Sequence, residues 1–195
     1  RSQAAGYGRT SYTLDGTNVG IAILDSGVYS VQRSFNDGRA GRLAYSKSFV
    51  SGVTSTDDDY GHGTHVASLA AGSAVRDVGA YEGVASDANI INLKVLDGQG
   101  KGTTSALLAA MDWIVTYHTT YNIRGANISL GAPSVDTWTN DPLCRKAQTL
   151  NNNGVLVVAA AGNNGKNALG QKVYGQVHSP GNDPSVLTVG ATNSL

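Results

Sequence analysis

Five short apolar runs, separated by helical patterns, most constrain what this chain of 195 residues can fold into. The runs are VGIAIL (19–24), NIINLKVL (89–96), ANISL (126–130), VLVVAAA (155–161) and SVLTVGA (185–191). Each has the length of a strand and is apolar almost throughout instead of alternating with polar residues. This pattern is typical of strands covered on both faces, as in a parallel sheet.

Helical patterns fall between these runs. Apolar residues at helical spacing follow the candidate caps Thr103 and Thr104, and a second helix is predicted to begin at Asp141 and Pro142 and to end at NNNG (151–154). HVASLAA (65–71) supplies a third helical pattern. Strands alternating with helices predict an α/β fold with a three-layer, doubly wound, mostly parallel sheet, and we expect residues 1–195 to form one domain.

Composition narrows the classes of partner. The 14 Lys and Arg residues balance the 14 Asp and Glu residues, so neither a nucleic acid nor an anionic membrane is an expected partner. No apolar run is long enough to span a bilayer, and the N-terminus lacks the pattern of a signal peptide. The single Cys144 leaves the compartment open, while abundant Ser, Thr, Asn and Gly with little Lys fit a secreted protein.

Asp25 and His62 are the first candidates for chemistry. Asp25 directly follows the first apolar run, at the carboxyl end of a strand where α/β sheets gather their sites, although it could also serve as a turn residue or as a phosphate acceptor. His62 lies between two glycines at the start of a helix, where a carboxylate partner would make it a general base. The alternatives are a metal site shared with His65, whose spacing does not fit HExxH, and a structural role, which is the favoured interpretation for His65.

Asn163 is a third candidate because it follows a buried strand in VLVVAAAGNNG. An amide just beyond a strand can donate a hydrogen bond to a developing oxyanion, although AGNNG alone is also typical of a turn.

Taken in chain order, ILDSGV, GHGTHVA, NISLGA and AAAGNNG resemble the subtilisin family of serine peptidases, and its proteinase K branch in particular, from about Val19 onward. The resemblance implies that Asp25 orients the imidazole, that His62 is the general base and then the acid, and that Asn163 donates to the tetrahedral intermediate. It also implies a polypeptide substrate that adds as a strand between two segments, with a pocket for the residue before the scissile bond. The residues on one side of that strand are Gly100, Lys101 and Gly102, those on the other are Ser129, Leu130 and Gly131, and those of the pocket are Ala160, Ala161 and Gly162. Simple turns are the alternative for these glycines.

The family's nucleophilic Ser lies in a GTSMAxP motif that residues 1–195 do not contain. Ser105 does not replace it, because GKGTTSALL (100–108) matches the family's substrate-side loop. We therefore expect residues 1–195 to be the N-terminal part of a serine endopeptidase, with a sheet that is incomplete at its C-terminus. This part should be inactive without a C-terminal fragment that carries the Ser, and a propeptide is expected to have bound it before maturation. The alternative is a non-catalytic peptide-binding protein on the same framework.

No cofactor is expected for catalysis, but the resemblance implies structural calcium as an option. Asp57, Asp58 and Asp59 are adjacent, which is poor geometry for one ion, so a solvated loop is favoured there. Residues 72–83 lie where relatives bind calcium, yet their sequence identifies no ligands. The bond between Ser179 and Pro180 falls where relatives have a cis peptide.

Overall fold

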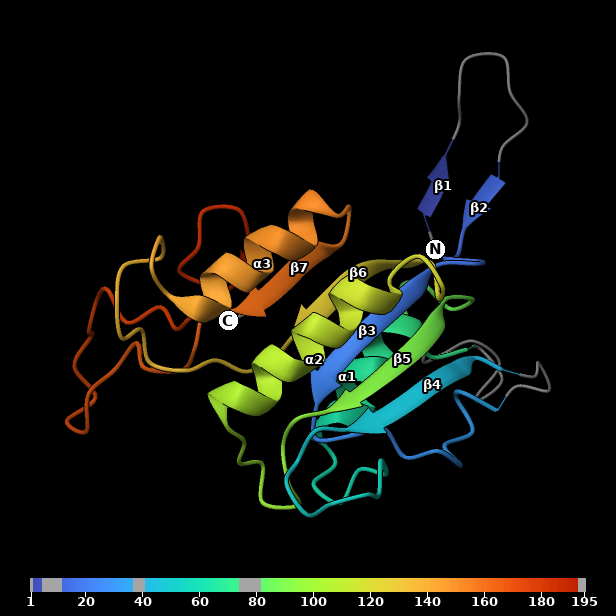
Figure 1. Cartoon of the computed structure of the whole chain (residues 1–195), viewed down its shortest axis with the longest axis horizontal. Coiled ribbons are helices and arrows are strands. Elements are labelled where there is room, and N and C mark those ends of the chain that lie inside the picture. Colours follow the sequence, from blue (N-terminus) through green and yellow to red (C-terminus); the bar gives the residue numbers. More distant parts are fainter. Residues whose placement is uncertain (1, 5–11, 37–40, 74–81, 193–195) are drawn as a thin grey trace.

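The computed structural model describes residues 2–4, 12–36, 41–73 and 82–192. Its centre is a sheet of six parallel strands in the order β4-β5-β3-β6-β7-β8 (Figure 1). These strands are β3 (Gly20–Asp25), β4 (Leu43–Ser48), β5 (Asn89–Lys94), β6 (Ile123–Ile128), β7 (Leu156–Ala160) and β8 (Leu187–Val189). Two further strands, β1 (Ser2–Ala4) and β2 (Tyr12–Leu14), form a separate antiparallel pair.

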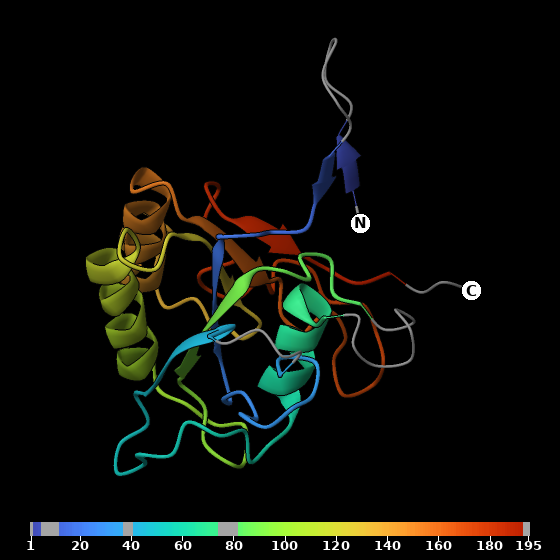
Figure 2. The ribbon, with the colours of Figure 1, turned by 90° about the vertical axis from the view of Figure 1, so that its right-hand side faces the viewer.

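Helices cover both faces of the large sheet. Helices α2 (Thr104–Tyr117) and α3 (Pro142–Asn152) lie on one face, and α1 (His62–Ala71) lies on the other (Figure 2). Each face has its own apolar core. The core under α2 and α3 includes Leu93, Met111 and Leu150, and the core under α1 includes Ile23 and Ala67. The predicted three-layer α/β fold is confirmed.

Each of the five apolar runs overlaps a strand of this sheet, although β6 begins three residues before its run, and β4 lies in a segment that the sequence marks as loop-rich. Its residues, LAYSKS, include no β-branched side chain and are only partly buried, because β4 is an edge strand paired with β5 alone. The β1–β2 pair was not predicted either.

Side-chain caps fix the starts of two helices where the sequence places them. The Thr103 hydroxyl accepts a hydrogen bond from the Ala106 N–H at 3.1 Å, and Asp141 accepts from the Leu143 N–H at 2.9 Å. Pro142 is the first residue of α3, where its missing N–H costs nothing.

The parallel arrangement determines where a site can form. The carboxyl ends of β3, β5, β6 and β7 all meet at one edge of the sheet, so the segments that follow them leave the sheet there. Asp25 ends β3, and the segments 95–102, 129–133 and 161–164 follow β5, β6 and β7. Within the described residues, no helix is both long and apolar enough to cross a membrane.

Candidate active site

Asp25 and His62 form a hydrogen-bonded pair at this edge. The His62 Nδ1 atom lies 2.8 and 2.9 Å from the two carboxylate oxygens of Asp25. Asp25 is 1% exposed, whereas 43% of the His62 side chain is exposed. The carboxylate therefore fixes the ring with its Nδ1–H toward Asp25, and Nε2 has no hydrogen-bond partner among the residues that the structure describes. An imidazole held in this way can take a proton at Nε2.

Glycine at position 63 is required for this close approach. A Cβ atom on Gly63 would collide with the carbonyl oxygen of Gly27 and would lie 3.0 Å from the Asp25 Cβ. The start of α1 can therefore lie directly against the end of β3. The Gly63 N–H donates to the Ser26 hydroxyl across this junction at 3.0 Å, and the Ser26 N–H donates to the carboxylate of the preceding Asp25 at 2.7 Å.

A second carboxylate, Asp58, holds the same junction. It accepts from the Ser26 hydroxyl at 2.8 Å, from the Gly61 N–H at 2.7 Å, and from the N–H and hydroxyl of Thr64 at 2.8 and 2.6 Å. Burial alone would raise the pKa of the Asp58 carboxyl, but these hydrogen bonds, led by that of the Thr64 hydroxyl, bring it below its ordinary value of 3.8. Asp58 thus stays ionised at the N-terminus of α1, where a negative charge is favourable.

The neighbouring aspartates have partners of their own. Asp57 accepts from the Ser30 N–H at 3.0 Å, and Asp59 lies 3.1 Å from the Nζ atom of the fully buried Lys94. Lys94 also donates to the Asp57 carbonyl oxygen at 2.5 Å. The loop is thus partly exposed, as Asp59 shows with 62% of its side chain accessible, and its three carboxylates also have hydrogen-bond or ion-pair partners.

Calcium remains a prediction. The described residues contain no group of three or more His, Cys, Asp or Glu side chains that could hold a metal ion. Most of the other candidate segment, residues 74–81, lies outside the described part of the chain.

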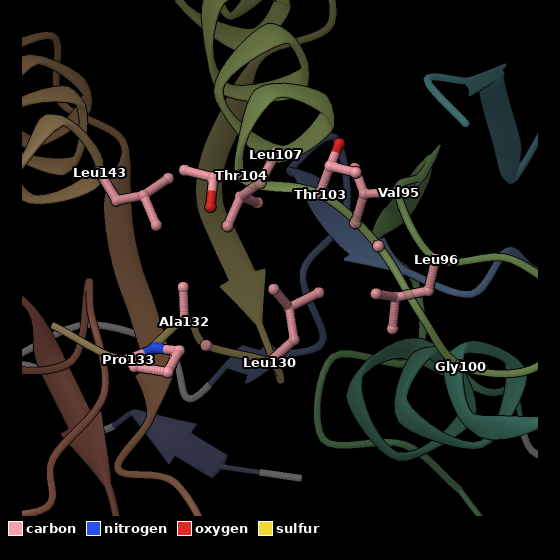
Figure 3. Close-up of a pocket in the computed structure, with 12 residues that line it drawn as sticks. Val95, Leu96, Gly100, Thr103, Thr104, Leu107, Leu130, Ala132, Pro133 and Leu143 are labelled. Carbon is pink, nitrogen blue, oxygen red and sulfur yellow. The ribbon is translucent and has the colours of Figure 1, made fainter. Parts of the chain in front are cut away.

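Two of the predicted substrate segments enclose a pocket. It has a volume of about 370 Å³ and opens between the loop after β5, which includes Gly100 and Gly102, and the loop after β6, which includes Leu130 and Gly131 (Figure 3). Leu107 of α2 is one of the apolar side chains that line it. Lys101 is exposed beside the pocket, and Ser129 accepts a hydrogen bond from the Asn127 amide at 2.8 Å. The arrangement can take an apolar side chain between two chain segments.

The third predicted segment begins at the last residue of β7, Ala160, and continues beyond the strand. Ala160 and Ala161 are partly buried, Gly162 is exposed with a φ of 96°, and Asn163 is exposed with no hydrogen bond to another described residue. Its amide is thus available at the same edge of the sheet as Asp25. The peptide bond between Ser179 and Pro180 is cis, as expected.

Within residues 2–4, 12–36, 41–73 and 82–192, no side-chain hydroxyl hydrogen-bonds to the His62 imidazole. Ser105, on the first turn of α2, shares its hydrogen bond at 2.9 Å with the Thr103 hydroxyl. None of the serines in the described ranges hydrogen-bonds to His62.

Comparison with known proteins identifies the family. A model of the Subtilase family matches residues 16–194, which is most of the sequence. The chain belongs to the subtilase family. It is 34% identical over 188 residues to the Serine protease AprX of Bacillus subtilis (strain 168) and 33% identical over 192 residues to Proteinase T of Parengyodontium album. A crystal structure of a cold adapted subtilisin-like serine proteinase superimposes with a TM-score of 0.67 at 31% identity.

These relatives are longer than the chain. The alignment with AprX covers 94% of this chain and 40% of AprX. The alignment with Proteinase T covers 95% of this chain and 57% of Proteinase T, and the superposition on the solved structure covers 92% of this chain and 57% of that structure. Residues 1–195 therefore span about half the length of the proteins that they match.

Proposed function

We propose that this protein is a serine endopeptidase in which Asp25 orients His62, His62 acts as general base and then as acid, and Asn163 donates to the oxyanion. The observation that carries the proposal is the pair formed by the buried Asp25 carboxylate and His62, with Nε2 left available. A general base positioned in this way takes the proton of an attacking hydroxyl and returns it to the leaving amine.

The nucleophilic Ser belongs, in this proposal, to a part of the protein other than residues 1–195. One observation that supports this is that no hydroxyl group of a described residue hydrogen-bonds to His62. Another is an uncovered apolar face on β7 and β8, opposite to α3. Leu156 on β7 and Leu187 and Val189 on β8 are about half exposed, and the register of the two strands places them on the same face. Apolar sheet faces of this kind are ordinarily buried, so a further element is expected to cover them.

The substrate is a polypeptide bound between the loops after β5 and β6. The pocket beneath that groove is lined by apolar residues such as Leu96, Leu130 and Leu143, which suits an apolar substrate side chain upstream of the scissile bond. Backbone pairing with an extended peptide accepts many sequences. We propose that the protein is secreted and cleaves polypeptides outside the cell.

A fluorophosphonate probe tests the proposal on the full-length protein, because the probe forms a covalent bond only with an activated serine. We expect labelling of wild type, loss of labelling in His62→Ala and normal labelling in the control His65→Ala, since His65 is exposed on α1 with no side-chain hydrogen bond to another described residue. Absence of labelling in a folded wild-type protein would contradict the proposal. Peptide binding without labelling would favour the alternative, a non-catalytic peptide-binding protein.

A further inference from the structure

Residues 164–177 form a loop that leaves the sheet edge directly after Asn163 and projects from the body of the molecule (the orange-red loop at the left of Figure 1). The two ends of this loop are joined. The His178 N–H donates to the Ala161 carbonyl at 3.2 Å, and the His178 Nε2 atom accepts a hydrogen bond from the Asn164 amide at 2.8 Å. The base of the loop is therefore fixed beside Asn163.

Two glycines let the end of the loop pack closely against the sheet edge. A Cβ atom on Gly131 would lie 2.7 Å from the His178 Cβ, and a Cβ atom on Gly162 would lie 3.1 to 3.3 Å from three atoms of its ring. Both are shorter than ordinary packing distances. His178 is thus held between the segments that follow β6 and β7, and the loop projects from a defined position.

The outer part of the loop is a small hairpin. Lys166 and Lys172 lie opposite each other in an antiparallel bridge. The Asn167 N–H donates to the Gln171 carbonyl at 2.9 Å, and the Asn167 side chain donates to the Gln171 side chain at 2.8 Å and accepts from its N–H at 3.0 Å. These bonds close the hairpin directly beyond the two lysines, so the lysines keep their places opposite each other.

The two lysines carry charges that the described part of the chain does not neutralise. Both are exposed, and neither Nζ atom forms an ion pair or a hydrogen bond with another described residue. The sequence contains no Asp or Glu between Asp141 and Asp183, and these two are each only 2% exposed. Like charges directly opposite each other on paired strands are destabilising. The charges of the pair therefore do not stabilise the hairpin, and they leave a positive patch open to an external anion.

Exposed apolar side chains flank this patch. Leu169, between the two lysines in sequence, and Tyr174, just after them, are each 83% exposed. Tyrosine is enriched in surfaces that bind polypeptides, because its rigid ring gives a large contact area at a low cost in side-chain entropy. The hairpin thus offers cations for the carboxylates of an acidic peptide segment and apolar area for its other side chains.

The order of the strands places the hairpin relative to the proposed substrate. The apolar pocket for an upstream side chain lies between the loops after β5 and β6, whereas the hairpin follows β7, on the other side of β6. An extended chain rises about 3.3 Å per residue, so Lys166 lies within about 10 Å of Asn163. A peptide that continues past the scissile bond covers this distance in about three residues.

We propose that Lys166 and Lys172 form an exosite, a second substrate-binding site outside the groove, for an acidic segment that begins about three residues after the scissile bond. The proposal rests on the peptidase function proposed above. Exposed charges of this kind mainly speed the encounter with a substrate of opposite charge and are screened by salt. The expected preference for the acidic segment is therefore modest, about fivefold in kcat/KM at low ionic strength.

The test uses two peptides that are identical up to the scissile bond and carry either a run of Glu or a run of Gln from about the third residue after it. For the full-length enzyme at low ionic strength, we expect kcat/KM to favour the Glu peptide about fivefold. This ratio should fall to about one in the double variant Lys166→Gln/Lys172→Gln, and in wild type at 1 M salt, with kcat/KM on the Gln peptide changed less than about twofold.

The matched control is Lys47→Gln/Lys146→Gln, which changes the net charge equally. Lys47 lies over the Phe49 ring on β4, and Lys146 pairs with Asp112 on the face covered by α2 and α3, so the control should keep the wild-type ratio.

A wild-type ratio near one, or a ratio that survives in the double variant of the hairpin, would overturn the proposal. An equal loss on both peptides would overturn it too, because the hairpin would then only support the position of Asn163. A preference that appears only when the Glu run precedes the scissile bond would overturn the placement. Failure of the peptidase function itself looks different, since wild-type protein would then neither label with the fluorophosphonate nor cleave either peptide.

Discussion

Replacing Asp58 with Ala tests whether the junction between β3 and α1 depends on this carboxylate. Its loss removes the acceptor for the first N–H groups of α1, which costs about 1 kcal/mol of unfolding free energy for a residue that caps a helix. It also leaves the hydroxyl of the fully buried Ser26 without its acceptor, which costs about 2 kcal/mol. We therefore expect Asp58→Ala to lower the free energy of unfolding by about 3 kcal/mol.

The measurement is urea denaturation of the full-length protein, treated with a sulfonyl fluoride so that autolysis does not interfere. The matched control is Asp112→Ala, since Asp112 forms an exposed ion pair with Lys146 and pairs of that kind contribute about 0 to 1 kcal/mol. The reasoning is refuted if Asp58→Ala is no more destabilising than the control.

The same residue gives a dependence on pH whose sign follows from its lowered pKa. A carboxyl with a pKa below 3.8 in the folded protein contributes its full charge-dependent stability above that ordinary value, and this contribution is lost as the pH falls through the folded pKa. The difference in unfolding free energy between wild type and Asp58→Asn should therefore be constant at neutral pH and shrink below about pH 4. A difference that grows in acid would contradict the assignment.

Three further predictions follow from single contacts. Asp25→Asn should reduce kcat on a peptide substrate by about 10⁴-fold, because the amide no longer stabilises the imidazolium and favours the wrong tautomer, and a loss below tenfold would argue against its role. Gly63→Ala should lower the unfolding free energy by about 1 to 3 kcal/mol through its collision with Gly27, whereas Gly125→Ala, with nothing within 4 Å of the added Cβ, should lower it by less. Cys144 is fully buried, and burial raises the pKa of its thiol, so the native protein should not react with a thiol reagent that labels it at once in guanidinium chloride.

Local signals in the sequence were enough to predict the strands and helix starts. Apolar runs indicate buried strands, and Thr103 and Asp141 indicate helix caps, because each of these signals lies within a few residues of the structure that it predicts. The contact between Asp25 and His62 joins residues 37 positions apart, and it was expected from the resemblance to the subtilisin family and not from a local pattern. Strand β4 was not predicted, because an edge strand is half exposed and does not need an apolar run.

Contacts between distant segments could not be predicted in the same way. Asp58 meets Ser26 across 32 positions of sequence, and nothing in STDDDYG distinguishes it from its two acidic neighbours. His178 meets Gly131 and Gly162 only after three loops have folded onto one edge of the sheet. The local feature that marks this position is the cis Ser179–Pro180 bond, which directly follows His178.

The packing of His178 against Gly131 and Gly162 limits which substitutions the three positions can accept together. While the imidazole is in place, neither glycine can acquire a methyl group without displacing it. The closest obstacle to Ala at position 131 is the His178 Cβ atom at 2.7 Å, so only glycine at position 178 would remove it. Position 162 still requires glycine, because its φ of 96° is unfavourable for most other residues. Positions 131 and 178 are therefore coupled, because a residue with a Cβ atom at one of them requires glycine at the other.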